Sequence, residues 1–166
     1  MRKLKDILAD KIADLINYML SMVIIPDITM DKVTELDEMQ IIELKEKYGI
    51  EGIILDVDNT IRKDMKSIPE INKEWIENIG KHLKVVIVSN GKDVKLEQYF
   101  KEKGINYIQF AHKPLKKNFL KACELMGLEP EQVLSVGDDL IDDIYGGRKN
   151  NNMKTVLIKS VEDESR

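Results

Sequence analysis

Hydrophobic residues recur every three or four positions over the first two dozen residues, the spacing of one face of an α-helix. The apolar positions are Leu4, Ile7, Leu8, Ile12, Leu15, Ile16, Met19, Met22 and Val23. Polar residues occupy the opposite face, so we expect an amphipathic helix that ends before Pro26. Its apolar face can pack on protein, either the protein's own core or a second copy. Alternatively, it can bind at a membrane surface. Packing is favoured, because Asp6, Asp10 and Asp14 dilute the positive charge typical of membrane-surface helices.

A second helix is expected to begin after Asp37, which suits the N-cap, and to stop at Gly49, where a positive φ is tolerated. The pattern then changes to short β-branched runs that alternate with helical segments. The runs are Gly52–Asp56, Lys84–Val88, Ile105–Phe110, Val133–Val136 and Thr155–Ile158. The helical segments are Ile71–Ile79, Val94–Lys103, Leu115–Met126 and Leu140–Arg148. This alternation predicts a Rossmann-like α/β fold: three layers, α/β/α, around a parallel sheet of about five strands.

Composition narrows the class of protein further. The 166 residues, 43% of them hydrophobic and 34% charged, suit one soluble globular domain, residues 26–166, preceded by the N-terminal helix in residues 1–25. A net charge of −4 does not favour nucleic-acid binding, and no apolar run approaches the roughly 20 residues of a membrane span. Cys123 is the only cysteine, which excludes an internal disulfide and, with no leader pattern, favours a cytoplasmic location.

Chemically reactive residues follow four of the predicted strands. The four segments are Asp56-Val57-Asp58-Asn59-Thr60, Ser89-Asn90-Gly91, His112-Lys113-Pro114 and Gly137-Asp138-Asp139-Leu140-Ile141-Asp142-Asp143. Ligands of open parallel sheets bind at the carboxyl ends of the strands. We therefore expect all four segments to face one crevice.

The residue types in that crevice indicate phosphate chemistry. Clustered carboxylates repel one another, and an oxygen-only ligand set favours a hard cation such as Mg²⁺, which is usually held by one or two carboxylates and a substrate phosphate. In such a site Asp56 can attack phosphorus, and Asp58 can protonate the leaving group and later activate water. Ser89 and Lys113 can hold the phosphoryl oxygens, with Asn90 lining the pocket beside them.

In their order along the chain these segments resemble the four motifs of the haloacid dehalogenase superfamily of phosphohydrolases and phosphotransferases. The resemblance implies that Asp56 is the nucleophile, Asp58 the acid and base, and Ser89 the phosphate-binding hydroxyl. It implies that Lys113 neutralises the phospho-intermediate. It also implies a Mg²⁺ ion held by Asp56, the backbone carbonyl of Asp58, and Asp138.

Residues from about 25 to 158 are similar, more narrowly, to the capless subclass IIIA branch, which includes the YqeG-type bacterial proteins and the mitochondrial phosphatidylglycerophosphate phosphatases. Asp139 and Asp142 stand where that branch usually has Gln and Thr, so a more acidic pocket is expected. Only about ten residues separate Thr60 from the helix near Ile71, too few for a lid domain. An open crevice suits a phosphate on a large or surface-bound molecule, and the resemblance points to a lipid such as phosphatidylglycerophosphate.

Each motif alone is also an ordinary turn or helix cap, and the conjunction of four in order favours function. The sequence therefore predicts a Mg²⁺-dependent phosphomonoester hydrolase that works through an aspartyl-phosphate on Asp56. A phosphotransferase or phosphomutase of the same fold and a non-catalytic phospho-ligand binding module remain the alternatives. Peripheral contact with the inner membrane surface and homo-oligomerisation through residues 4–25 also stay open. So do metal roles for Asp139, Asp142 and Asp143, and substrate contacts by His112, Lys116 and Lys117.

Overall fold

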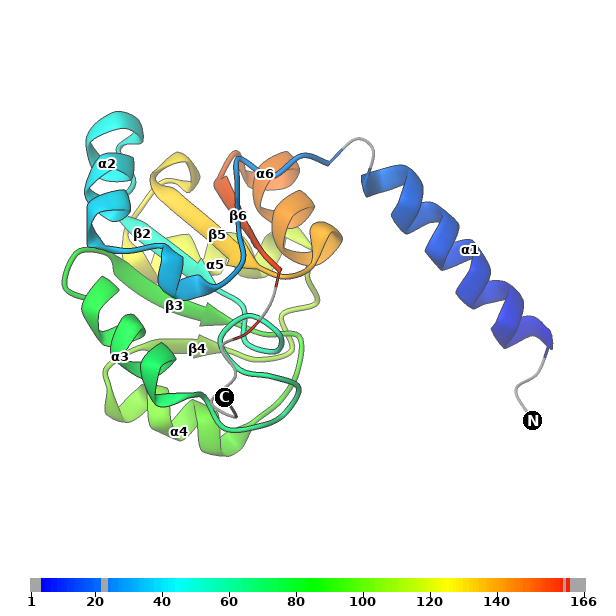
Figure 1. Cartoon of the computed structure of the whole chain (residues 1–166), viewed down its shortest axis with the longest axis horizontal. Helices are drawn as coiled ribbons and strands as arrows, with labels where there is room; N and C mark the ends of the chain where they lie inside the picture. Colours follow the sequence, from blue (N-terminus) through cyan, green and yellow to red (C-terminus); the bar gives the residue numbers. More distant parts are fainter. Residues whose placement is uncertain (1–3, 22–23, 160, 162–166) are drawn as a thin grey trace.

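A six-stranded parallel sheet forms the centre of the protein, as seen in a computed structural model that describes residues 4–21, 24–159 and 161 (Figure 1). The strands lie in the order β1-β6-β5-β2-β3-β4. Their bounds are β1 Ile28–Met30, β2 Gly52–Leu55, β3 Lys84–Val88, β4 Asn106–Ile108, β5 Val133–Gly137 and β6 Lys154–Ile158. Since β2 pairs with both β3 and β5, the first acidic motif follows an interior strand, at the carboxyl end of the sheet.

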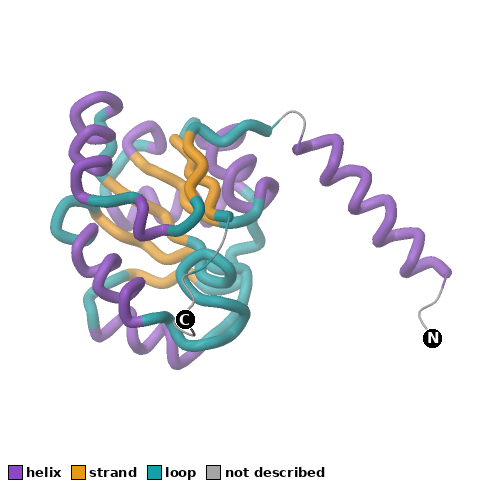
Figure 2. The backbone as a smooth tube through the Cα atoms, in the orientation of Figure 1, coloured by secondary structure: helices purple, strands orange, loops and turns teal. Residues whose placement is uncertain are grey.

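Helices cover both faces of the sheet, so the predicted three-layer α/β/α fold is confirmed (Figure 2). The α-helices are α1 Leu4–Ser21, α2 Glu38–Tyr48, α3 Glu70–Ile79, α4 Val94–Glu102, α5 Lys116–Met126 and α6 Gly146–Asn151. Buried side chains of α2, α3 and α4 pack on one face, among them Trp75 and Phe100. Phe119 and Cys123 of α5 pack on the other. Two apolar layers thus hold the strand ends in a fixed arrangement.

The sheet has one strand more than the sequence predicts. β1 spans three residues and pairs in parallel with β6 at the edge of the sheet. Its position is fixed by Asp27, whose Oδ2 accepts hydrogen bonds from the N–H and the hydroxyl of Thr155, at 2.9 and 3.0 Å. Because these partners lie 128 residues apart in sequence, no local pattern indicates the strand.

The helix predicted over Leu140–Arg148 is instead two elements. Residues Leu140–Tyr145 form a π-helix, η3, and α6 follows directly. The side chain of Asp139 accepts hydrogen bonds from the N–H groups of Ile141 and Asp142 at 2.7 and 2.8 Å, which starts the wider turn. Isolated π-turns occur frequently at functional sites.

The N-terminal helix α1 forms as predicted, but it does not pack on the protein's own core. Its apolar side chains Leu8, Ile12, Leu15, Ile16 and Met19 are between 50% and 61% exposed. Figure 1 shows the helix extending away from the sheet. The expectation that the helix packs on the protein's own core is therefore wrong. A second copy of the chain and a membrane surface are the other two partners considered for its apolar face. Positions 22 and 23 lie outside the described residues, and none of the described helices is long and apolar enough to span a membrane.

Candidate active site

A tight turn after β2 sets the direction of the first acidic motif. The N–H of Asp56 still donates to the carbonyl of Val136 in β5 at 2.9 Å, and the chain then reverses. The carbonyl oxygen of Val57 accepts a hydrogen bond from the N–H of Arg62 at 3.2 Å. Asn59 has a φ of 59°, a left-handed conformation that asparagine adopts more readily than most residues. The first acidic motif therefore lies on a turn at the carboxyl end of β2, and not on a continued strand.

Lys113 lies between two carboxylates at this edge. Its Nζ is 2.6 Å from Asp56 Oδ1 and 2.6 Å from Asp143 Oδ1. Burial disfavours the charge on Lys113, but the two carboxylates outweigh it and raise the pKa of the ammonium group above its ordinary value. The hydroxyl of Thr60 donates to the other oxygen of Asp56 at 3.2 Å. Asp56 is thus held at both oxygens beside a permanent cation.

The motif after β3 holds Lys113 in place. Asn90 Oδ1 accepts a hydrogen bond from the backbone N–H of Lys113 at 2.7 Å. Asn90 Nδ2 donates to Asp142 Oδ2, also at 2.7 Å, so this one side chain connects the ends of three strands. Ser89 is buried, and its hydroxyl accepts a hydrogen bond from the N–H of Gly91 at 3.1 Å.

Three carboxylates form a cluster that suits a metal ion. Oxygen atoms of Asp56, Asp138 and Asp143 all lie within 4.8 Å of one another. Burial, together with the charge of Asp56, raises the pKa of Asp138 to about 6. Complete burial raises the pKa of Asp143 as well, although Lys113 opposes the shift. Because a divalent cation would relieve this repulsion, and the donors are all oxygen, the cluster fits a hard ion such as Mg²⁺.

The π-helix carries Asp143 into this cluster. The N–H of Asp139 donates to Asp143 Oδ2 at 3.2 Å, and the hydroxyl of Ser135 donates to the carbonyl of Asp143 at 2.9 Å. A Cβ on Gly137 would stand 2.0 Å from Asp143 Oδ2. The absence of a side chain at Gly137 therefore makes room for the Asp143 carboxylate.

The structure brings most of the predicted site residues to one edge of the sheet. Asp56 and Asp138 belong to the acidic cluster, Lys113 contacts Asp56, and Asn90, which follows Ser89, binds the backbone of Lys113. The side chain of Asp58 is not one of the three carboxylates of this cluster. Its Oδ1 accepts hydrogen bonds from Arg62 Nε at 2.8 Å and from the N–H of Met65 at 3.2 Å.

The residues whose roles the sequence left open now divide into three groups. Asp143 joins the acidic cluster, whereas Asp142 binds Asn90 and Asp139 caps η3. His112, Lys116 and Lys117 are exposed. Two functional candidates, Arg62 and Asp93, were not predicted at all: Arg62 contacts Asp58 and Asp93 together. The only signal was a basic residue four positions after Asp58, which matters solely because the chain turns there.

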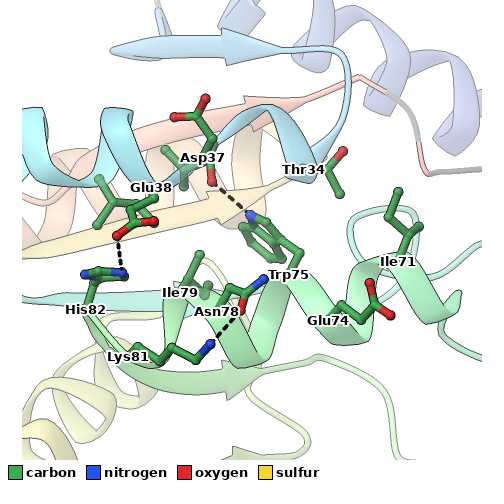
Figure 3. Close-up of a pocket in the computed structure, with 12 residues that line it drawn as sticks. Thr34, Asp37, Glu38, Ile71, Glu74, Trp75, Asn78, Ile79, Lys81 and His82 are labelled. Atoms are coloured by element: carbon green, nitrogen blue, oxygen red, sulfur yellow. Dashed lines mark hydrogen bonds and ion pairs between the residues drawn. The ribbon is translucent and has the colours of Figure 1, made fainter.

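One cavity of the protein lies away from this site, and another adjoins it. A groove of about 630 Å³ between α2 and α3 is lined by Trp75 and His82 among others (Figure 3). It lies away from the site, because His82 precedes β3 whereas Ser89 follows it. A second cavity, of about 550 Å³, adjoins the acidic cluster. It is lined by Asn59, Lys63, Asp138, Leu157, Ile158, Lys159 and Val161.

Comparison with known proteins identifies the family of the chain. A family model for haloacid dehalogenase-like hydrolases matches residues 80–151. The probable phosphatase YqeG of Bacillus subtilis is 36% identical over 121 residues, which cover 72% of this chain and 69% of that protein. The chain belongs to the haloacid dehalogenase-like hydrolases. Within this family it is an enzyme of the phosphatase class, as the sequence predicts.

Other relatives of this hydrolase are longer or more distant. A glyceraldehyde 3-phosphate phosphatase of Pyrococcus furiosus is 29% identical over 127 residues, 71% of this chain but only 52% of that protein. A Legionella pneumophila protein assigned to haloacid dehalogenase subfamily III A superposes with a TM-score of 0.55 at 19% identity, covering 75% of this chain and 74% of that one. The 3-deoxy-D-manno-octulosonate 8-phosphate phosphatase of Yersinia pestis has a TM-score of 0.50 at 17% identity, covering 70% and 68%. These likenesses support the fold.

Proposed function

We propose that this hydrolase cleaves phosphomonoesters through a covalent aspartyl-phosphate on Asp56, with Mg²⁺ held by Asp56, Asp138 and the backbone carbonyl of Asp58. The observation that carries the proposal is the contact of Lys113 with Asp56 at 2.6 Å, beside the buried carboxylate of Asp143 and the half-buried carboxylate of Asp138. A carboxylate fixed next to a cation and a cluster suited to a metal is a nucleophile prepared for an anionic substrate. Asp143 would support the same site through Lys113.

In the first step an oxygen of Asp56 attacks phosphorus, and the bond from phosphorus to the leaving oxygen breaks. Asp58 gives its proton to that oxygen, which departs as an alcohol. Ser89, Asn90 and Lys113 hold the phosphoryl oxygens. The metal ion, when bound, would neutralise charge on the phosphoryl group. In the second step Asp58 takes a proton from water, which attacks phosphorus, and Asp56 leaves as a carboxylate with release of inorganic phosphate.

Hydrolysis is favoured over transfer to a second substrate because the described residues form no lid domain between the motifs of the site. The segment between the turn at Arg62 and α3 is short, and only α4 lies between β3 and β4. Water would therefore reach the aspartyl-phosphate, which a transferase must protect. A non-catalytic binding module would need neither the nucleophile nor its acid.

An open site also favours a substrate with a large leaving group. The cavity beside Asp138 offers Lys63 and Lys159 together with apolar Leu157, a lining that suits a group both anionic and apolar. By the family resemblance, a lipid phosphate such as phosphatidylglycerophosphate is the proposed substrate. We assign catalysis to residues 26–166 and place the protein in the cytoplasm. We assign α1 to contact with a second copy of the chain or with the inner membrane surface.

Phosphate release from sugar, nucleotide, phosphopeptide and glycerophospholipid phosphates, measured with and without Mg²⁺, tests the proposal. Asp56→Asn should abolish turnover on every ester and form no beryllofluoride adduct. Asp37→Asn, which changes a helix cap far from the cluster, is the matched control and should retain turnover. A wild-type protein without Mg²⁺-dependent turnover on any ester would instead support the binding module.

A further inference from the structure

Arg62 is almost completely buried between two carboxylates that belong to different segments. Only 5% of its side chain is exposed. Arg62 Nε lies 2.8 Å from Asp58 Oδ1, and Arg62 Nη1 lies 2.6 Å from Asp93 Oδ2. A guanidinium group can bind both partners at once because its N–H donors point in fixed, separate directions.

Both ends of this connection are rigidly held. On one side the N–H of Asn59 donates to the carbonyl of Arg62 at 2.7 Å, inside the turn that also contains Asp58. On the other side Asp93 Oδ1 accepts the N–H of Leu96 at 3.0 Å and so caps α4. Arg62 thus connects the turn after β2 to the start of α4, the helix that follows the neighbouring strand β3.

The two oxygens of Asp58 have different surroundings. Oδ1 accepts hydrogen bonds from Arg62 Nε and the N–H of Met65, two groups that can only donate. Oδ2 lies 3.9 Å from the point where a Cβ on Gly91 would stand, and the Ser89 hydroxyl oxygen lies 3.6 Å from the same point. A proton on Asp58 must therefore sit on Oδ2, the oxygen on the side of the phosphate-binding serine.

We propose that Arg62 is a positioning residue that occupies Asp58 Oδ1 and so directs Oδ2 toward the leaving oxygen of the substrate. The inference rests on the proposed function, because it assumes that Asp58 is the acid of the first step. In that step the proton on Asp58 Oδ2 moves to the leaving oxygen as its bond to phosphorus breaks, which yields an alcohol and the Asp58 carboxylate. Without Arg62, only the N–H of Met65 would hold Asp58 Oδ1, so the carboxyl group would be less well oriented and would protonate the leaving oxygen less often.

The leaving group gives a readout that a purely structural role would not change. An alkoxide needs a proton to depart, whereas 4-nitrophenolate departs without one, so loss of acid catalysis slows only the alkyl ester strongly. The measurement is kcat/KM for glycerol phosphate and for 4-nitrophenyl phosphate. The ratio of the two values does not depend on the fraction of folded enzyme, so partial unfolding of a variant cannot imitate the effect.

We expect Arg62→Gln to lower kcat/KM for glycerol phosphate by about 30- to 100-fold, at or just below the lower end of the range of acid–base catalysis because Asp58 itself remains. The value for 4-nitrophenyl phosphate should fall by less than about 3-fold. Arg62→Lys should fall between, because one ammonium group cannot replace both N–H donors. Asp58→Asn should show the full discrimination, and adding Arg62→Gln to it should discriminate no further. Lys45→Met, which removes an ion pair with Glu51 elsewhere, is the matched control and should keep the wild-type ratio.

Equal losses on both esters in Arg62→Gln would overturn the positioning role and leave Arg62 a structural residue. Discrimination by Arg62→Gln that is undiminished in the Asp58→Asn background would overturn it too, because Arg62 would then act through another group. Failure of the proposed function is distinguishable. In that case the wild type has no Mg²⁺-dependent turnover, or Asp58→Asn itself fails to discriminate, and the inference falls with it.

Discussion

The ammonium group of Lys113 touches the carboxylate of Asp56 at 2.6 Å although 57 residues separate the two in sequence. The contact joins the end of β2 to the segment after β4, two strands that are not neighbours in the sheet. It is nearly dry, since 3% of the Lys113 side chain and 11% of the Asp56 side chain are exposed. A buried pair of this kind affects both stability and chemistry, so its removal should be visible in both.

Lys113→Met should abolish phosphatase activity and destabilise the protein. Removal of one partner of a buried ion pair costs about 3–5 kcal/mol, because the other charge stays buried without compensation. Here Asp56 and Asp143 would both lose their cation. Urea unfolding of the metal-free protein measures the loss, and phosphate release measures the activity.

Lys45→Met is the control for this variant. Lys45 is a partly exposed partner of Glu51, so its loss should cost about 1 kcal/mol or less and leave turnover intact. Equal destabilisation by the two variants would contradict the assignment of Lys113 as the buried cation of the site.

Two adjacent residues of the acidic motif after β5, Asp142 and Asp143, should differ sharply in their effect on the Mg²⁺ requirement. Asp143→Asn should raise the Mg²⁺ concentration for half-maximal turnover by about tenfold or more, because Asp143 is in the acidic cluster and also pairs with Lys113. Asp142→Asn should change it by no more than about threefold, since Asp142 binds Asn90 outside the cluster. Magnesium titrations of phosphate release compare them, and a larger shift in Asp142→Asn would count against this division.

Sequence patterns predicted the centre of the sheet well because its strands are short, buried and β-branched. The run at Gly52–Leu55 has every residue buried, and the apolar residues alone indicate it. β1 could not be found in this way, since three residues carry no period and its position depends on Asp27 and Thr155. Local propensity indicates an element only where packing repeats along it.

The site itself was predictable as far as strand ends determine it. Asp56 and Asp138 directly follow β2 and β5, and Lys113 lies in the loop after β4, so the parallel sheet brings them to the same end of the strands. The choice between Asp142 and Asp143 depends on the π-helix, which no spacing revealed. Arg62 was missed for a similar reason, because its contacts exist only through the turn after β2.

The ion pair between Arg62 and Asp93 should make stability depend on pH in the acid range. Burial alone would raise the pKa of Asp93, but hydrogen bonds from Arg62 and the N–H of Leu96 lower it below its ordinary value of 3.8. A carboxyl whose pKa is lower in the folded state stabilises that state above its ordinary pKa. This contribution is lost as pH falls through the lower, folded-state value.

Asp93→Asn should therefore lower the free energy of unfolding by about 1 kcal/mol at pH 7, and the difference from wild type should shrink as pH falls below the ordinary value of 3.8 and through the lower, folded-state pKa. Urea unfolding from pH 7 to pH 2.5 measures it. Asparagine still caps a helix, so the effect isolates the charge. Asp37→Asn, an equivalent change at the cap of α2 without an ion pair to arginine, is the matched control for the loss of a cap charge.

Deletion of residues 1–25 should leave the catalytic body intact. The apolar side chains of α1 whose burial is described, Leu8, Ile12, Leu15, Ile16 and Met19, are half exposed or more, so their removal loses little buried area. The free energy of unfolding should therefore change by less than about 1 kcal/mol. Turnover on soluble esters should persist for the same reason. Light scattering and flotation with anionic vesicles, on the full chain and the deletion, then report what covers the helix: a change of mass indicates a second copy, whereas lost flotation indicates the membrane. A deletion protein that unfolds or loses turnover on soluble esters would show that α1 belongs to the catalytic unit.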